Sequence, residues 1–281
     1  MKGIIFSIEE FAIYDGPGIR ANVFFKGCPL RCRWCHNPEG LSPKIQIAHS
    51  PNGCLSCGKC TKACSSPDNC KLCGECIKAC PRGLVNFMGQ EWDADKLAER
   101  ILKLKKILSN GGGVTYSGGE VLMQANFLIE MLDKTSELHR AIETSGHGKT
   151  DDFKKILERV ELVYFDLKLM DPDDHKRYTG VTNELILKNA RVLMDSGVEH
   201  IFRVPFIKDV NTSKENLTAM AEFLRSSPIK ENVEFLLYNK MAGAKYPLMG
   251  KTYTEAFEQP DAEDIQLAKE ILADFNVSFR K

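Results

Sequence analysis

The sequence lacks cysteine after residue 80, although 11 cysteines lie between Cys28 and Cys80. It also lacks an excess of one charge, because 38 Lys and Arg balance 38 Asp and Glu, which gives no sign of a nucleic-acid partner. No apolar run reaches the roughly 18 residues of a membrane span. The apolar run near Met1 is too short for a signal peptide. We therefore expect a cytoplasmic protein with no membrane or nucleic-acid partner.

The clustered cysteines indicate metal ligation. A disulfide framework would leave one of the 11 cysteines unpaired and would require an oxidising compartment, for which the sequence shows no export signal. The remaining composition, 43% hydrophobic and 27% charged, is typical of a globular protein.

Residues 54 to 80 contain an internal repeat. The segments CLSCGKCTKAC and CKLCGECIKAC are identical at 7 of 11 positions. Each resembles half of a bacterial ferredoxin, in which the fourth cysteine of a run binds the other cluster. The predicted ligands are Cys54, Cys57, Cys60 and Cys80 for one [4Fe–4S] cluster, and Cys64, Cys70, Cys73 and Cys76 for the other. Two zinc knuckles are the alternative, but eight evenly spaced cysteines without histidine favour iron–sulfur.

Cys28, Cys32 and Cys35 form a separate CxxxCxxC motif that has no fourth cysteine. His36 is one candidate for the fourth ligand, although adjacent ligands at 35 and 36 would strain a cluster. The other interpretation is an iron left open for a substrate, as catalytic metal centres require.

The motif, with Trp34 as its aromatic residue, resembles the signature of radical S-adenosylmethionine (SAM) enzymes. The resemblance implies that SAM completes a third [4Fe–4S] cluster through its amino and carboxylate groups. An electron from that cluster would then cleave the cofactor to methionine and a 5′-deoxyadenosyl radical.

Downstream, predicted strands alternate with predicted helices. The strands are expected at 20–27, 112–118, 140–144, 161–168, 200–206 and 232–238, and the helices at 93–110, from 151, near 173 and 183, near 213, and at 261–275. This alternation indicates an α/β fold with six parallel βα units, whose functional residues lie at the carboxyl ends of the strands. The family resemblance implies a partial (β/α)6 barrel of the TIM type, formed by residues 1–48 and 82–281. Residues 49–81 would be an inserted two-cluster ferredoxin-like domain.

The resemblance narrows to the activating enzymes of glycyl radical enzymes. It is carried by YDGPGIR at 14–20, HNPE at 36–39, YSGGE at 116–120, ETSG at 143–146, and DLK and TGVTN further on. It implies an oxidoreductase that uses SAM to abstract a hydrogen from a glycine Cα of a partner enzyme. The products would be a glycyl radical, 5′-deoxyadenosine and methionine. The electron donor would be flavodoxin or ferredoxin, and we expect a monomer.

The resemblance also implies roles for individual residues. Asp15 would contact the partner's glycyl loop, and Glu143 with Asp166 would form a monovalent cation site. The implied cofactor-binding residues are Trp34, Cys35, His36, Gly118, Gly119, Glu120, Glu143, Asp166, Leu167, Lys168, Arg203 and Asn239. From the residues alone, GGE also fits an ordinary βα turn, DGPG fits turn chemistry, and Arg203 fits a structural ion pair. The five remaining histidines show no metal-binding spacing.

Two other functions fit parts of the sequence. A radical SAM enzyme for a small molecule would share the three-cysteine motif, but it would not explain DGPGIR. An electron carrier would explain the eight repeated cysteines, but not the three-cysteine motif or the GGE turn.

Overall fold

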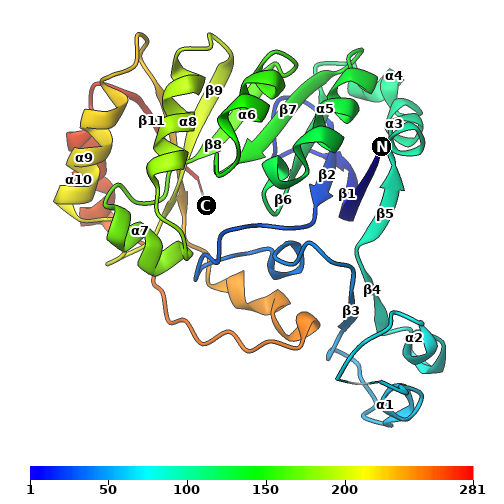
Figure 1. The fold of residues 1–281 in the computed structure, drawn as a ribbon. Coiled ribbons are helices and arrows are strands. Elements are labelled where there is room, and N and C mark those ends of the chain that lie inside the picture. The colour runs from blue at the N-terminus through cyan, green and yellow to red at the C-terminus, as the bar shows by residue number, and fades with distance from the viewer. Residues whose placement is uncertain (67, 281) are drawn as a thin grey trace.

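A computed structural model describes residues 1–66 and 68–280. Its main element is a nine-stranded sheet with strand order β11-β10-β9-β8-β7-β6-β2-β1-β5 (Figure 1). The strands are β1 (Lys2–Ala12), β2 (Arg20–Phe25), β5 (Gln90–Asp93), β6 (Gly113–Gly118), β7 (His139–Thr144), β8 (Leu162–Asp166), β9 (Glu199–Phe206), β10 (Asn232–Leu237) and β11 (Asn276–Arg280).

Seven of these strands are mutually parallel and lie side by side in the order β2, β6, β7, β8, β9, β10 and β11. This confirms the α/β class and the parallel sheet. Each of the six predicted strands corresponds to an observed one.

β11 is a further parallel strand that the sequence prediction missed. The helix expected at 261–275 ends earlier, at Ile271, and β11 then pairs with β10 from Asn276 onward. Phe279 on β11 stacks on Phe235 of β10, with ring centres 5.1 Å apart. Five residues are too few for a clear alternating pattern, and only the packing partner on β10 makes the strand recognisable.

The amino-terminal segment was also not predicted as a strand. β1 runs antiparallel to β2 on one side and to β5 on the other, so β5 forms one edge of the sheet.

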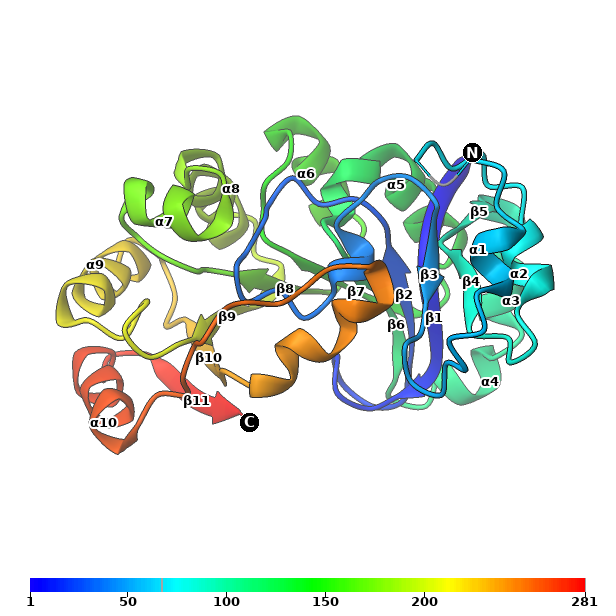
Figure 2. The ribbon, with the colours of Figure 1, turned by 90° about the horizontal axis from the view of Figure 1, so that it is seen from below.

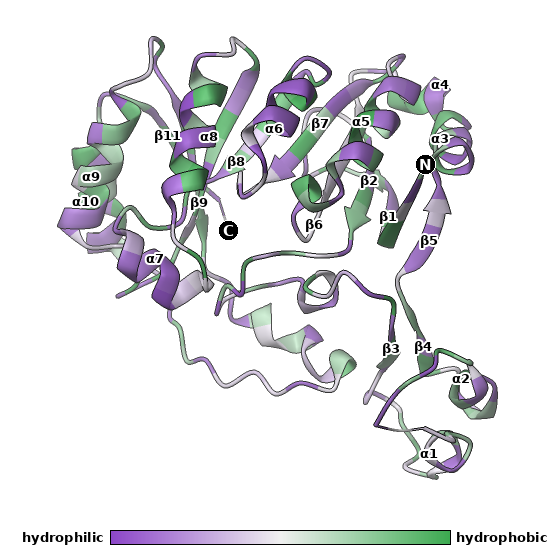
Figure 3. Cartoon of the chain, viewed as in Figure 1, coloured by the Kyte–Doolittle hydropathy of each residue, from purple (hydrophilic) through white to green (hydrophobic). Residues whose placement is uncertain are grey.

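Helices cover one face of the sheet in chain order. They are α3 (Ala94–Leu102), α4 (Lys105–Leu108), α5 (Ala125–Lys134), α6 (Thr150–Leu157), α7 (Pro172–Thr179), α8 (Glu184–Met194), α9 (Lys214–Leu224) and α10 (Ala262–Ile271). α3 packs on α5, α5 on α6, α6 on α8, and α9 on α10. The main core lies between this helical layer and the sheet. In Figure 3 the strand β2 is largely apolar, whereas α7 is largely polar.

Several long connections lie at the carboxyl ends of the parallel strands, below the sheet in Figure 1. They include the cysteine loop 28–41 and the 3-10 helices η1 (Pro38–Gly40), η3 (Lys240–Lys245) and η4 (Pro247–Met249). A further 3-10 helix, η2 (Val121–Gln124), precedes α5.

A two-stranded ribbon carries the segment with the repeated cysteines. β3 (Gln46–His49) and β4 (Val85–Met88) pair antiparallel, and between them lie the short helices α1 (Lys59–Lys62) and α2 (Glu75–Ala79). The segment projects away from the sheet in Figure 1, and in the view from below it lies at the end of the molecule that carries β5 and α3 (Figure 2). In the described part of the chain, no helix is long and apolar enough to cross a membrane.

Candidate active site

A cavity of about 400 Å³ lies at the carboxyl ends of the parallel strands. This volume is within the range of small-molecule sites, about 300–1,000 Å³. The predicted site residues in its wall are Cys28, Cys32, Trp34, Cys35, His36, Gly118, Gly119, Glu143, Asp166, Lys168, Arg203 and Asn239. They come from the cysteine loop and from the ends of five strands, so the fold brings together residues that are more than 200 positions apart.

The cysteine loop is held by backbone hydrogen bonds at both its ends and its middle. Cys28 N donates to Leu41 O at 3.2 Å, and Cys35 N donates to Cys32 O at 3.1 Å. Arg31 N and Arg33 N donate to the carbonyls of Thr179 and Tyr178, at 2.6 and 3.0 Å. The loop is therefore fixed to the end of α7, and its three thiols face one cavity.

The three thiols fit an iron–sulfur cluster. Burial raises the pKa of Cys28 and Cys35, and it raises the pKa of Cys32 to about 12. As free thiols they would stay protonated, whereas iron binds them as thiolates. Within the described residues, no three His, Cys, Asp or Glu side chains converge on one metal ion. A cluster does not require such convergence, because each of its thiolates binds a different iron.

The glycine turn after β6 holds the start of this loop through backbone hydrogen bonds. Gly119 N donates to Phe25 O at 2.9 Å, and Glu120 N donates to Gly27 O at 2.8 Å. A Cβ on Gly119 would lie 2.2 Å from Gly27 O and 2.7 Å from Gly40 O. Only glycine fits between the two ends of the cysteine loop.

The Glu120 side chain points into the protein and not into the cavity. It is fully buried and accepts hydrogen bonds from Thr144 Oγ1, from Ser145 N and Oγ, and from Leu122 N, at 2.5 to 3.1 Å. Burial raises the pKa of Glu120 despite these donors. The carboxylate therefore joins the ends of β6 and β7, and only the backbone of this turn faces the site.

Arg203 is the centre of an ion network on the face of the sheet opposite the helices. Its Nη1 contacts Glu143 Oε1 at 2.5 Å, and its Nε contacts Glu234 Oε2 at 2.7 Å. Its guanidinium carbon lies 3.5 Å from the centre of the Tyr164 ring. Ser117 Oγ donates to the other oxygen of Glu143. Glu234 and Tyr164 were not found from the sequence, because nothing in their local pattern marks them as partners of Arg203.

Lys168 places a cation in the cavity wall. Its Nζ donates to Asp166 Oδ2 at 2.7 Å, and the side chain is only 7% exposed. Burial opposes the charge, but the Asp166 carboxylate together with the Cys32 and Cys28 sulfurs raises the pKa of Lys168 above its ordinary value. Leu167 between them is buried in the core and does not line the cavity.

The three remaining wall residues are positioned by packing or capping. Trp34 is buried, with ring centres 6.2 Å from Tyr178 and 6.1 Å from Phe257. His36 lies edge-on to Tyr238. Asn239 accepts a hydrogen bond from Met241 N at 2.9 Å and begins η3.

Asp15 is not among the residues that line the cavity, and it lies in the turn between β1 and β2. Its carboxylate accepts from Asn22 Nδ2, and its carbonyl accepts from Thr115 Oγ1 at 2.7 Å. Arg20, the first residue of β2, is fully buried and donates to Thr115 Oγ1 and Val114 O at 2.6 and 2.7 Å. The turn is thus seated on the inner face of the sheet.

The eight repeated cysteines lie on the projecting segment, away from this cavity. All are free and exposed or half-exposed: Cys54, Cys57, Cys60, Cys64, Cys70, Cys73, Cys76 and Cys80. Backbone N–H groups point at two of the sulfurs, from Ser56 to Cys54 at 3.4 Å and from Leu84 to Cys80 at 3.3 Å. The donors lower the pKa of Cys80. N–H donors of this kind stabilise thiolates, as iron–sulfur ligands require.

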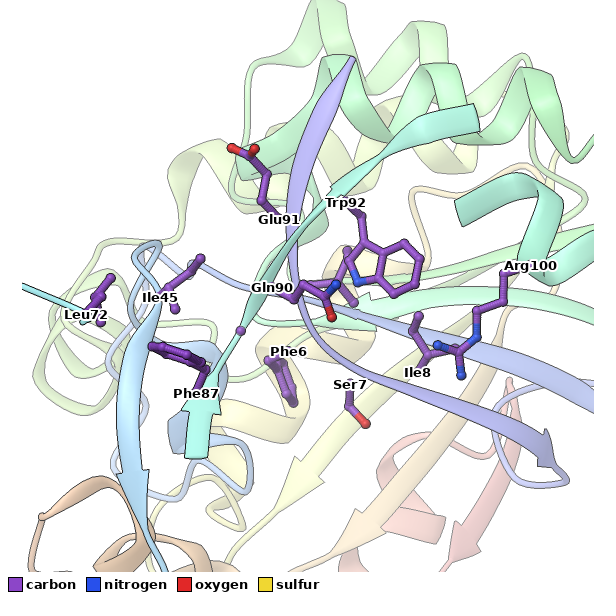
Figure 4. A pocket seen from close by; sticks show the side chains of 12 residues that line it. Phe6, Ser7, Ile8, Ile45, Leu72, Phe87, Gln90, Glu91, Trp92 and Arg100 are labelled. Atoms are coloured by element: carbon purple, nitrogen blue, oxygen red, sulfur yellow. The ribbon is translucent and has the colours of Figure 1, made fainter. Parts of the chain in front are cut away.

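A second cavity, of about 520 Å³, lies between this segment and the edge of the sheet (Figure 4). Leu72 and Phe87 line one side of it, and Trp92 lines the other. Its charged residues are already paired, Glu91 with Lys2 at 2.7 Å and Arg100 with Glu10 at 2.9 Å. It therefore offers no reactive group, and the first cavity is the candidate site.

Comparisons with known proteins find relatives over most of the chain. Residues 14–164 match the family model described as a 4Fe-4S single cluster domain. The trans-4-hydroxy-L-proline dehydratase activating enzyme of Clostridioides difficile is 38% identical, over 96% of each chain. The choline trimethylamine-lyase activating enzyme of Oleidesulfovibrio alaskensis is 37% identical, over 90% of this chain and 88% of that one. The 4-hydroxyphenylacetate decarboxylase activating enzyme of Clostridium scatologenes is 34% identical, over 90% and 88%.

Two solved structures are similar to this chain in fold. A domain of a pyruvate-formate lyase-activating enzyme from Bacteroides vulgatus matches with a TM-score of 0.52 and 31% identity, covering 61% of this chain and all of that one. A radical SAM methyltransferase from Sphaerobacter thermophilus matches with a TM-score of 0.55 at 14% identity, over 93% and 66% of the two chains.

Proposed function

Because this chain belongs to the radical SAM activating enzymes of glycyl radical enzymes, we propose that its cavity holds one [4Fe–4S] cluster on Cys28, Cys32 and Cys35 with SAM beside it. When bound, the two groups supply reductive cleavage of SAM and hydrogen abstraction from a glycine Cα of the partner. The observation that carries the proposal is that three free thiols share one cavity with a buried cation and a glycine turn.

The chain's own residues would bind and orient the cofactor. The Lys168 ammonium attracts the carboxylate of the methionine part, and the backbone at Gly118 and Gly119 allows close approach. The Arg203 network fixes the inner wall. His36, Trp34 and Asn239 would contact the rest of the cofactor. No side chain is required as a general base, because the cofactor carries the chemistry.

Glu120 would act through its backbone and by holding the turn, since its carboxylate is already bound by Thr144 and Ser145. The monovalent cation site predicted at Glu143 and Asp166 gains no support, because Arg203 pairs with Glu143 and Lys168 pairs with Asp166. Each carboxylate therefore already has a protein cation as its partner.

We also propose two auxiliary [4Fe–4S] clusters on the projecting segment, so that the chain holds three in all. Residues 49–81 would be a ferredoxin-like domain inserted into a partial (β/α)6-type barrel of residues 1–48 and 82–281. The support is the cysteine repeat, together with the placement of α1 and α2 between the strands of one ribbon. Flavodoxin or ferredoxin would supply the electron to a monomeric enzyme.

The partner would be a glycyl radical enzyme of the kinds that the relatives activate: a dehydratase, a choline lyase or an arylacetate decarboxylase. The test mixes the reduced, reconstituted protein and SAM with these three enzymes anaerobically and records electron paramagnetic resonance spectra. A glycyl doublet with one enzyme is the expected result. Deoxyadenosine without any doublet would favour a small-molecule substrate, and the absence of both would leave an electron carrier.

A further inference from the structure

An extended stretch near the carboxyl terminus contacts the cysteine loop without a backbone partner of its own. Lys251 N donates to Tyr246 O at 3.0 Å, and Glu258 O accepts from Lys208 N at 3.2 Å. Between these two points, within the part of the chain that the structure describes, the backbone of residues 252–257 makes no hydrogen bond to another backbone group. In Figure 1 this stretch belongs to the orange coil at the bottom of the molecule. We call residues 252–257 the strap.

Side chains therefore attach the strap to the rest of the protein, and they alternate along it. Tyr253, Glu255 and Phe257 are half-buried, whereas the residues between them are exposed. This alternation is that of an extended chain with one face packed on the protein. A segment without backbone hydrogen bonds opens more readily than a strand inside a sheet, so each of its side-chain contacts matters.

The inward side chains of the strap contact the middle of the cysteine loop, at the two residues between the second and third cysteines. Arg33 forms a two-point ion pair with Glu255, from Nε to Oε1 at 2.9 Å and from Nη2 to Oε2 at 2.6 Å. The rings of Trp34 and Phe257 meet edge to face, with their centres 6.1 Å apart. A two-point pair between arginine and a carboxylate is stronger than a single contact, because it fixes orientation as well as distance.

The same part of the loop is also fixed to α7. Arg33 N donates to Tyr178 O at 3.0 Å, and the Arg33 guanidinium carbon lies 5.4 Å from the centre of the Tyr178 ring. Cys32 packs against the apolar cluster that contains Trp34 and Phe257. Two elements therefore hold the loop, a helix with its own backbone hydrogen bonds and a strap that has none. Of the two, the strap is the one that can detach.

We propose that the strap is a clasp for the three-cysteine site, and that Arg33 and Glu255 are positioning residues whose ion pair keeps it closed. The inference rests on the proposed function, because the loop that is held carries the predicted cluster ligands Cys32 and Cys35. With the clasp closed, these two cysteines keep their spacing, and Phe257 covers the buried ring of Trp34 between them. With the clasp open, the loop moves and the site loses iron more readily.

The test follows the strap and the site separately, in the reconstituted protein under anaerobic conditions. The variants are Arg33→Met, Glu255→Gln, and the exchanged pair Arg33→Glu with Glu255→Arg. Trypsin cleavage after Lys251, beside the strap, reports opening, and cleavage after the exposed Lys149 before α6 is the internal reference. Iron loss from the three-cysteine site to a ferrous chelator is followed by the electron paramagnetic resonance signal that changes when SAM is added.

The matched control is Arg225→Met, which breaks another exposed arginine–carboxylate pair. Arg225 donates to Asp274 at 3.0 and 3.2 Å, at the opposite end of the strands from the cavity. We expect each single clasp variant to raise both cleavage after Lys251 and iron loss about fivefold or more, and the exchanged pair to restore both rates to within about twofold. The control should change neither rate.

Wild-type rates of cleavage and iron loss in both single variants would overturn the clasp alone. Faster cleavage after Lys251 with wild-type iron loss would also overturn it, because the strap would then move independently of the site. Equal acceleration after Lys149 would overturn it as well, since that result reports general unfolding. A wild-type protein with no SAM-dependent signal would overturn the proposed function of the site together with the clasp.

Discussion

Substituting alanine for Gly119 should separate the two ends of the cysteine loop. The added Cβ would lie 2.2 Å from Gly27 O, and real Cβ contacts essentially never fall below 3.0 Å. The backbone must therefore move by about 0.8 Å, directly beside Cys28. Overpacking of this kind costs about 1–3 kcal/mol, which in a protein of this size lowers Tm by roughly 2–12 °C and leaves the fold intact. A misplacement near 1 Å at a reacting centre costs on the order of 10² in rate.

The assay is deoxyadenosine formation by the reduced, reconstituted protein without a partner, together with the iron content and Tm. We expect Gly119→Ala to remain folded, to bind less iron at the three-cysteine site and to form deoxyadenosine on the order of 10²-fold more slowly. The control is Gly197→Ala, at a positive φ with open space around the added Cβ, which should lose stability only. Wild-type iron content and rate in Gly119→Ala would refute the reasoning.

Cys32→Ala should abolish deoxyadenosine formation, measured by liquid chromatography, whereas Cys57→Ala should only weaken it; full turnover by Cys32→Ala would contradict the cluster assignment. Arg203→Met should lower the free energy of unfolding in urea by about 3–5 kcal/mol, because two largely buried carboxylates lose their shared cation; a loss below 1 kcal/mol would show that the network is weak. His200 Nε2 lies 2.9 Å from Glu231 Oε2, and although burial opposes it, this carboxylate raises the pKa of His200. The pair should therefore stabilise the fold fully below about pH 6.5 and progressively less as the pH rises through the folded-state pKa, and Glu231→Gln should remove that slope in urea titrations.

The sequence was sufficient for features that depend on local spacing. The alternation of strands and helices predicted the parallel sheet. The three-cysteine motif and the glycine turn predicted part of the cavity wall. Positions such as Lys168 and Asn239 followed from the rule that parallel strands end at one edge. β11 was missed because five residues have little pattern of their own, and β1, although 11 residues long, was missed because its apolar residues do not alternate strictly with polar ones.

Features that depend on pairing between distant residues were not predictable from one sequence. Arg203 contacts Glu143 and Glu234 across 60 and 31 positions, and no local signal joins them. The orientation of Glu120 was likewise hidden, because the GGE motif does not say whether the carboxylate faces the cavity or the next turn. The choice depends on Thr144 and Ser145, whose hydroxyl groups and backbone are close only after β6 and β7 have paired.

The ribbon of β3 and β4 also makes the projecting segment a replaceable module. His49 and Val85 are directly opposed in its register, so residues 50–84 leave and re-enter the molecule at adjacent points. A two-residue hairpin turn such as Asn-Gly would join those points without changing the pairing of the ribbon. The same junction would accept a segment from another protein, so natural lineages and protein engineers can gain, lose or exchange it as a cassette while the sheet and its cavity stay unchanged.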